Sequence, residues 1–129
     1  MSSPYTVVNV KQVEDAAVRF GMAPNIESRF ARRALELRNS GLTYLRLAPG
    51  YRMPFGHAHE RQEEIYLVVS GSVTMKLDDD LVELGAWDAI RVAPEVVRAS
   101  EAGPNGAEIV AFGAPQAKDT QMRPDFWPA

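Results

Sequence analysis

The chain contains no cysteine among its 129 residues. This absence excludes disulfide scaffolds, cysteine-ligated zinc, iron–sulfur clusters and thiol nucleophiles. Positive charge is not in excess either, because 14 Lys and Arg stand against 17 Asp and Glu, for a net charge of −3. A chain with this balance has no general basic surface for a nucleic-acid backbone, so we expect no nucleic-acid partner.

Long hydrophobic runs are also missing. No apolar stretch approaches the roughly 20 residues that a membrane-spanning helix needs. The first five residues, MSSPY, lack the charged and then apolar layout of a secretory signal. We therefore expect a cytoplasmic protein with no membrane partner. The length suits one domain with one sizeable core.

Turn residues punctuate the chain from about residue 28 onward, at intervals of roughly 8–12 residues. Short apolar or alternating runs lie between the turns, and the expected strands are 29–37, 42–47, 64–69, 73–77, 81–84, 87–92, 96–101 and 108–112. We expect a tight turn at 78–80 and a hairpin loop at 103–106, where Asp, Gly, Pro and Asn gather. Many short strands with almost no helix predict an all-β sandwich or barrel.

The two ends of the chain differ from this pattern. Residues 1–27 are expected to form an arm, with an extended segment at 5–8 and a short helix across 10–20 that Gly21 can end. Residues 28–114 are assigned to the β-barrel. Residues 115–129 lose their periodicity and are interpreted as a tail, in which Phe126 and Trp127 can pack.

The only two histidines, His57 and His59, are one residue apart. In a strand, residues i and i+2 share a face, so both imidazoles can converge on one ion. Glu64 opens the strand expected at 64–69, and a hairpin at 60–62 would bring its carboxylate back to the imidazoles. Two histidines and one carboxylate suit a divalent first-row metal with open coordination positions. The same residues also fit a solvated strand edge, because short motifs often match by chance.

Two segments carry a resemblance to a known family. Residues 49–71 hold a glycine, a spacer, His-x-His, four residues, Glu, six residues and Gly71, and they resemble the first conserved motif of the cupin superfamily. The spacer from Gly50 to His57 is one residue longer than usual. Residues 85–94 resemble the start of the second motif. The resemblance implies a cupin-type double-stranded β-helix, a jelly-roll-like barrel, here with a short N-terminal helical segment.

The resemblance also implies a metal site. Its ligands would be His57, His59 and Glu64, and its ion a divalent Fe, Mn, Ni or Zn. Glu63 is the competing carboxylate. We prefer Glu64 because six residues separate it from the closing glycine of the motif.

Two further residues are expected beside the ion. Tyr66 shares the strand parity of Glu64 and would present its hydroxyl to the same interior. Gln62 lies in the turn between the histidines and the glutamate. We expect both to contact the metal site or a bound small molecule.

The second motif departs from the family pattern. The family usually ends this motif with a histidine that completes the metal site, and the corresponding position falls at Arg98 or its neighbour Val97. Two interpretations stay open. A three-ligand site persists and Arg98 binds an anionic substrate, or metal binding is lost and Arg98 pairs with Glu64. A guanidinium is always charged and is repelled by a divalent ion, so a metal suits an Arg98 that faces away from it.

The expected function is therefore a small-molecule-binding cupin with a divalent metal in its barrel. Its enzymatic form would be of the dioxygenase or isomerase type, acting on a small and anionic substrate. The alternative is a metal-free ligand-binding or sensor module without catalysis. Small cupins commonly pair through sheet edges, and an exposed edge strand invites pairing, so a homodimer is expected.

Overall fold

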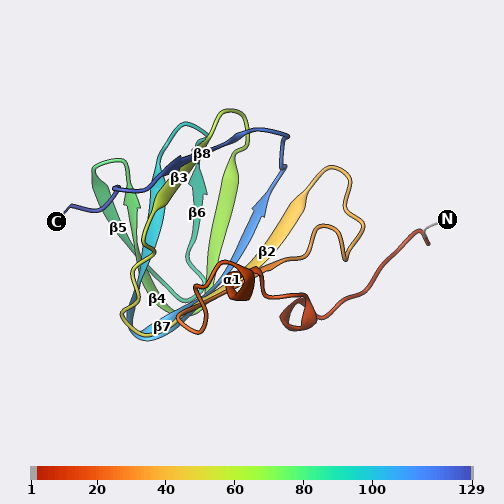
Figure 1. Ribbon diagram of the computed structural model, residues 1–129, viewed down its shortest axis with the longest axis horizontal. Coiled ribbons are helices and arrows are strands. Elements are labelled where there is room, and N and C mark those ends of the chain that lie inside the picture. Colours follow the sequence, from red (N-terminus) through yellow and green to blue (C-terminus); the bar gives the residue numbers. More distant parts are fainter. Residues whose placement is uncertain (1–2, 129) are drawn as a thin grey trace.

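The computed structural model describes residues 3–128. Its elements, labelled as in Figure 1, are a 3-10 turn η1 (Val10–Gln12), α1 (Ala16–Arg19), β1 (Ile26–Phe30), β2 (Gly41–Leu47), β3 (Gly56–His59), β4 (Glu64–Leu77), β5 (Asp80–Gly85), β6 (Ala89–Val92), β7 (Arg98–Gly113) and β8 (Thr120–Arg123). The predicted all-β class with a short N-terminal helix is confirmed.

The eight strands form one hydrogen-bonded sheet that curls over on itself (Figure 1). β4 and β7 are the two longest strands, and they pair with each other along nearly their whole length. Around one half of this pair, β1, β2 and β6 complete a first half-sheet; around the other half, β3, β5 and β8 complete a second. The two half-sheets enclose one interior, which is the predicted double-stranded β-helix.

The bend between the half-sheets lies where β4 and β7 shift register. The shifts fall between Val68 and Ser70 and between Gly71 and Val73 of β4. A Cβ atom at Gly71 would lie 2.0 Å from the Gly106 carbonyl oxygen, and its φ is +75°, so only glycine fits this close approach. The hairpin loop predicted at 103–106 is wrong, because this segment lies within β7 and strand pairing with β4 continues on both sides of it.

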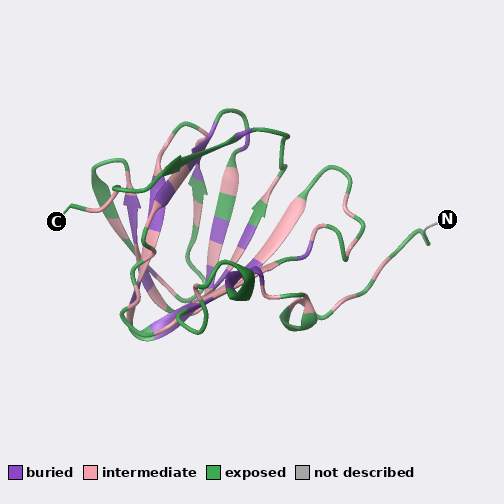
Figure 2. Cartoon of the chain, viewed as in Figure 1, coloured by how far each residue is buried: buried purple, intermediate pink, exposed green. Residues whose placement is uncertain are grey.

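Strand alternation places the core between the half-sheets. Tyr66 and Val68 of β4 are buried in one hydrophobic cluster with Val73, Met75 and Ile109. Buried positions recur along the strands of the curl (Figure 2). The turn expected between β4 and β5 is confirmed, since Leu77 pairs with Asp80 across two turn residues. Glu64 shares the parity of Tyr66 and Val68, so its side chain also enters the interior.

The N-terminal segment covers one opening of the barrel. No strand forms at 5–8, and the predicted helix is split into η1 and α1. Asp15 caps α1 by accepting a hydrogen bond from Ala17 N at 3.0 Å, and the same oxygen accepts one from Ser28 N of β1 at 2.9 Å. The first barrel strand ends at Phe30 rather than at 37, because residues 32–36 form turns.

The C-terminal segment, expected to be a tail, takes part in the barrel. β8 pairs with β3, and Asp119 just before it is only 2% exposed. The indole of Trp127 donates to the Met53 carbonyl oxygen at 2.8 Å, and the Arg52 guanidinium lies 4.3 Å from its ring centre. Among residues 3–128, no helix has the length and apolar character needed to cross a membrane.

Candidate functional site

Three potential metal-binding side chains converge inside the barrel. His57 and His59 lie on β3, and Glu64 is the first residue of β4. The Nε2 atoms of His57 and His59 lie 3.4 and 3.2 Å from Glu64 Oε1, and the three ligand atoms are within 4.8 Å of one another. The two imidazole rings meet edge to face, with centres 5.1 Å apart. This is a compact set of two nitrogens and one oxygen.

The route by which these residues meet differs from the expected one. The predicted hairpin at 60–62 is wrong, because β3 pairs with β7 and β8, whereas β4 pairs with β5, β6 and β7. The histidines and Glu64 therefore belong to different half-sheets and meet across the interior. Glu63, the competing carboxylate, is exposed, while the side chain of Glu64 is 15% exposed.

Among residues 3–128, all hydrogen bonds and ion-pair contacts of the Glu64 carboxylate fall on one oxygen, Oε1. Besides the two imidazoles, Oε1 accepts hydrogen bonds from the Tyr66 hydroxyl and from Arg98 Nη1, both at 2.7 Å. Burial raises the pKa of Glu64, but the hydrogen bonds from His57 and Tyr66 and the nearby imidazoles outweigh it and lower the pKa to about 2. Glu64 is therefore ionised across the physiological range.

Arg98 faces the interior and is 1% exposed. It lies opposite His57 in the pairing of β3 with β7. Besides Glu64, its guanidinium donates to the carbonyl oxygens of Val96 at 2.9 Å, Ala93 at 2.7 Å and Pro94 at 3.2 Å. The pairing of Arg98 with Glu64, one of the two open interpretations, is present. All three guanidinium nitrogens are engaged inside the protein, so the structure gives no support to Arg98 as a receptor for an anionic substrate.

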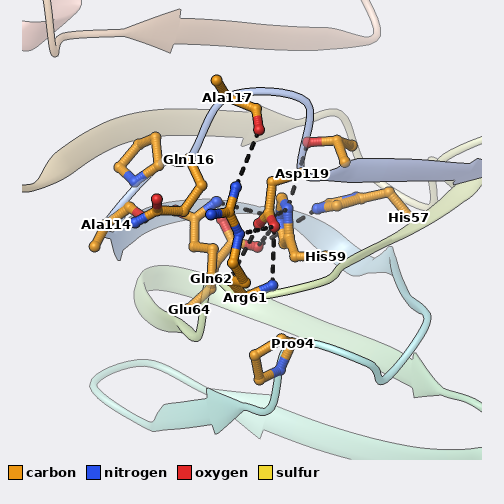
Figure 3. A network of polar contacts seen from close by, with 12 residues as sticks. His57, His59, Arg61, Gln62, Glu64, Pro94, Ala114, Gln116, Ala117 and Asp119 are labelled. Atoms are coloured by element: carbon orange, nitrogen blue, oxygen red, sulfur yellow. Dashed lines mark hydrogen bonds and ion pairs between the residues drawn. The ribbon is translucent and has the colours of Figure 1, made fainter.

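Asp119 is a site residue that the sequence did not indicate. Its carboxylate accepts hydrogen bonds from the backbone N–H groups of Arg61 at 2.9 Å and Gln62 at 3.0 Å, and its Oδ2 lies 3.5 Å from His59 Nδ1 (Figure 3). Burial raises the pKa of Asp119, but the hydrogen bonds from Gln62 and Arg61 outweigh it and lower the pKa. Asp119 thus fixes the loop between β3 and β4 and faces the outer edge of His59.

His59 lies between two carboxylates. Its Nε2 is 3.2 Å from Glu64 Oε1 and its Nδ1 is 3.5 Å from Asp119 Oδ2. Burial is the largest influence on the pKa of His59 and lowers it, against the opposing effect of Glu64. A neutral imidazole has one N–H and one lone pair. One nitrogen of His59 therefore turns a lone pair toward a carboxylate oxygen. The two electron pairs repel each other, and a cation bound between them would remove this repulsion.

Gln62 and Tyr66 both lie beside this cluster. Gln62 is 8% exposed and its Nε2 is 3.5 Å from His59 Nε2, at the limit of a hydrogen bond. Gly113 makes room for it, since a Cβ atom there would lie 2.2 Å from Gln62 Oε1. The predicted contact of Gln62 and Tyr66 with a bound molecule stays a prediction.

Two cavities adjoin the cluster. One has a volume of about 260 Å³ and reaches from Glu64 and His57 toward α1; the other, of about 370 Å³, lies between the cluster and β8. They share the lining residues Phe30, Thr43, His57, Glu64 and Ala111. The carboxylate and the His57 imidazole therefore form the polar boundary between two lobes of one interior.

The similarity of this chain to known proteins is found in its structure and not in its sequence as a whole. No protein-family model matches the sequence, and no curated protein does. Among solved structures, the chain is similar to a cupin protein from Bacteroides fragilis, with a TM-score of 0.72 and 23% identity over 91% of this chain and 89% of that one. It is also similar to a sugar phosphate isomerase from a cupin superfamily of Silicibacter pomeroyi, with a TM-score of 0.68 and 17% identity over 95% and 96% of the two chains.

Similarity extends to one part of a larger enzyme. Oxalate decarboxylase from Bacillus subtilis matches with a TM-score of 0.72 and 18% identity, over 90% of this chain and 32% of that one. The resemblance found in residues 49–71 and 85–94 is thus matched by the fold as a whole. At these identities the likeness concerns the architecture.

Proposed function

This chain has the fold of the cupin superfamily, and from that premise we propose that it binds a small molecule beside a divalent first-row transition metal. His57, His59 and Glu64 would hold the ion at the polar boundary between the two cavities. The candidate ions are Fe(II), Mn(II), Ni(II) and Zn(II), all of which accept imidazole and carboxylate ligands. The observation that carries the proposal is the position of His59 between Glu64 and Asp119.

Two of the three donor-atom pairs have the spacing that one ion requires, and the third pair lies within 4.8 Å. Ligand atoms bound at about 2.0–2.2 Å to the same ion lie about 3–3.5 Å apart. The Nε2 atoms of His57 and His59 are 3.4 and 3.2 Å from Glu64 Oε1. The three side chains therefore need little movement to share an ion, and a three-residue set leaves coordination positions for a ligand.

Asp119 supports the same assignment. Metal-binding histidines commonly donate their second N–H to a carboxylate, which fixes the tautomer and the ring orientation. Here Asp119 Oδ2 lies 3.5 Å from His59 Nδ1, and Thr120 Oγ1 lies 3.4 Å from the same nitrogen. With the proton on Nδ1, the lone pair of Nε2 points toward Glu64, where the ion would lie.

The positive charge of Arg98 would lower the affinity of the site for a metal ion without preventing binding. Arg98 adds one positive charge to the cluster, and Glu64 and Asp119 add two negative charges. Arg61, whose side chain is 60% exposed, lies 3.5 Å from Asp119 and adds a second positive charge, so with neutral imidazoles the four charges sum to zero before an ion enters. We therefore propose binding of a divalent ion that is weaker than in a site with a histidine at position 98.

The ion, the residues around Glu64 and the cavity walls would have different roles in binding a ligand. A bound ion would supply a Lewis acid for an oxygen of the ligand. Tyr66 and Arg98 hold the Glu64 carboxylate in place with two hydrogen bonds of 2.7 Å. The apolar walls of the cavity exclude water from the ligand. Metal-dependent catalysis of the dioxygenase or isomerase type is the enzymatic form of this proposal.

A metal-free ligand pocket is the second candidate, and the Arg98–Glu64 ion pair favours it. The two donors at 2.7 Å, Arg98 and Tyr66, occupy both lone pairs of Oε1. In this candidate Arg98 replaces the ion as the positive partner of Glu64. The barrel would then bind a small molecule without a metal and act as a carrier or sensor.

Metal analysis separates the two candidates. The protein is analysed by mass spectrometry of its elements as purified, then stripped with chelator and titrated calorimetrically with each of the four ions. We expect one ion per chain after reconstitution. His59→Ala should weaken binding by more than about 100-fold, because it removes a ligand rather than a supporting residue.

Arg98→His sharpens this test, with Arg91→His as its control. An imidazole at position 98 would lie opposite His57 and add a fourth ligand, so affinity should rise. Arg91 is an exposed residue of β6, and its substitution should leave affinity unchanged. A protein that takes up no stoichiometric ion, with His59→Ala titrating like the unmodified chain, would overturn the metal proposal and leave the metal-free pocket.

The homodimer stays a proposal as well. β1 lies at one edge of the sheet order and pairs only with β2 in the described chain. Its free side offers backbone groups to a second copy. Light scattering at several protein concentrations tests this, and a monomeric mass at all of them would contradict it.

A further inference from the structure

The cavity of about 260 Å³ next to His57 is apolar over nearly its whole wall. Ten of its lining side chains are hydrocarbon, thioether or phenyl groups, and they are Ala16, Ala17, Phe20, Met22, Ile26, Phe30, Leu45, Met53, Phe55 and Ala111. Its polar side chains are those of Ser28, Thr43, His57, Glu64 and Tyr66. Small-molecule sites commonly combine an apolar wall with a few polar groups that orient the ligand. This cavity has both parts.

No cationic side chain reaches either lobe. Within residues 3–128, neither the cavity near α1 nor the one near β8 has a lysine or arginine in its lining. Arg98 is committed to Glu64 and to three backbone carbonyl groups. A phosphate group would thus meet the Glu64 carboxylate and no guanidinium or ammonium to offset its charge. The expectation of an Arg98-bound anionic substrate has no counterpart in this lining.

A polyhydroxylated ligand suits the wall no better. A hydroxyl group that leaves water and finds no hydrogen-bond partner costs roughly 1–3 kcal/mol. The residues between 16 and 30 that wall the cavity offer alkyl, thioether and phenyl groups, with Ser28 as the exception. A sugar would leave several hydroxyl groups unpaired, whereas a hydrocarbon or aromatic body would lose none.

The N-terminal segment sets the size and the mouth of the cavity. Ala16 and Ala17 of α1 present only methyl groups to it, and Asp15 ties α1 to β1 through Ser28 N. Phe20 and Phe30 line the cavity and are 70% and 56% exposed, so they mark the side that opens to solvent. The volume lies just below the range of about 300–1,000 Å³ that is typical of drug-sized ligands, which limits the occupant to about one ring.

We propose that this cavity binds an uncharged, mainly apolar molecule of about one ring, whose single hydroxyl or carbonyl oxygen lies beside His57 and Tyr66. The inference deepens the proposed function by naming its ligand class. It rests on that proposal only in placing the oxygen of the ligand at the His57–Glu64 cluster. The inference that the rest of the ligand is apolar depends only on the side chains that line the cavity.

The test compares a neutral phenol with its phosphate ester. Calorimetry and ligand-observed NMR are run with 4-ethylphenol, 4-ethylphenyl phosphate and glucose 6-phosphate, each on chelator-treated and on metal-titrated protein. We expect 4-ethylphenol to bind at least tenfold more tightly than either phosphate in both preparations. Equal or tighter binding of a phosphate would overturn the proposal, and so would no binding of 4-ethylphenol.

A matched pair of threonine variants locates the site. Thr43→Phe places a ring in the cavity, since Thr43 lines both lobes, and should reduce 4-ethylphenol binding at least tenfold. Thr74→Phe, on a different strand and away from both lobes, should leave it unchanged. Equal effects of the two variants would overturn the location. If Thr43→Phe fails to fold, Ala17→Met serves as a milder filling of the same cavity.

The outcomes keep this inference apart from the metal proposal. Stoichiometric metal without 4-ethylphenol binding overturns the ligand class and leaves the metal site standing. Binding of 4-ethylphenol to a protein that takes up no ion supports the ligand class and overturns the metal site.

Discussion

Glu64 and Glu108 belong to the same curled sheet, and each carboxyl group has its pKa lowered to about 2, yet one faces the interior and the other the outer surface. Glu108 on β7 accepts hydrogen bonds from Ser70 to Oε1 at 2.7 Å and from Tyr44 to Oε2 at 2.6 Å. Lys11 also reaches Oε2 at 3.0 Å. Both oxygens of Glu108 are therefore occupied, and the residue links β2, β4, β7 and the N-terminal segment.

The contacts of Glu64 are distributed differently. Tyr66, Arg98 and both imidazoles all approach Oε1, and in the described part of the chain Oε2 accepts no hydrogen bond. A carboxylate with both oxygens hydrogen-bonded stabilises the fold. A carboxylate with one free oxygen, beside two histidines and a cavity, can still bind a metal ion or a ligand. The pKa alone does not distinguish these roles, but the distribution of donors over the two oxygens does.

The largest expected effect comes from removing the buried partner of Glu64. Arg98→Met should lower the free energy of unfolding by about 3–5 kcal/mol, because it leaves Glu64 charged in the interior without its cation. Tyr44→Phe, which removes one donor from Glu108, should cost only about 1 kcal/mol. Urea denaturation of both variants measures the contrast.

Two controls accompany Arg98→Met. Arg91→Met removes an exposed arginine and should be nearly neutral. Adding Glu64→Gln to Arg98→Met should recover part of the loss, because the uncompensated charge is gone. A loss from Arg98→Met no larger than that from Tyr44→Phe would erase the distinction between the two carboxylates.

The next largest effect concerns the interior site, where the Asp119 carboxylate lies beside His59. Asp119→Asn removes the carboxylate beside His59 Nδ1, and metal affinity should fall by about 10- to 100-fold. Asp125→Asn alters an exposed aspartate of the same segment and should change nothing. Calorimetric titration of the four ions gives the ratio. Unchanged affinity in Asp119→Asn would show that Asp119 only holds the loop at Arg61 and Gln62.

Much of this architecture is predictable from the sequence because it depends on local spacing. Turn residues between alternating runs indicate the barrel, and the parity of Glu64 with Tyr66 places the carboxylate inside. The His-x-His spacing puts both imidazoles on β3. What the spacing does not contain is strand order, and this is why the hairpin predicted at 60–62 is wrong: the same residues meet across the barrel rather than along one edge.

The missed residues depend on contacts between distant segments. Asp119 is 60 positions after His59, in a segment without periodicity, and only the pairing of β8 with β3 brings it to the site. The apolar cavity similarly takes one wall from α1, whose alanines suggest nothing about a ligand until β1 and β2 are beside them. The pairing of Arg98 with Glu64 is one of the two interpretations that the sequence leaves open, and it depends on a strand register that also brings the carbonyl groups of Ala93, Pro94 and Val96 to the guanidinium.

A smaller effect comes from the ionisation of Glu108. Its folded pKa of about 2 lies below the ordinary value of 4.5, so its stabilising contribution is fully present above pH 4.5 and is lost as the pH falls toward 2. The side chain is 28% exposed, so solvent reduces this contribution to about 1–2 kcal/mol. Urea denaturation at pH 5.5 and pH 3 should show that Glu108→Gln loses this part of the pH dependence. An identical pH dependence in both proteins would assign the acid sensitivity to other carboxylates, such as Glu64 or Glu27.

The smallest expected effect is that of the most exposed donor to Glu108. The Lys11 side chain is 61% exposed, and it lies 3.0 Å from Glu108 Oε2 and 5.5 Å from the centre of the Tyr44 ring. An exposed ion pair gives about 0.2–1 kcal/mol, so Lys11→Met should lower the free energy of unfolding by no more than that. Combined with Glu108→Gln in a double-mutant cycle, the coupling should shrink in 1 M salt, where screening acts over about 3 Å. A salt-independent coupling above 1 kcal/mol would mean that the N-terminal segment is held to β7 as firmly as Arg98 is held to Glu64, and the contrast between a surface brace and an interior site would then rest on the free oxygen of Glu64 alone.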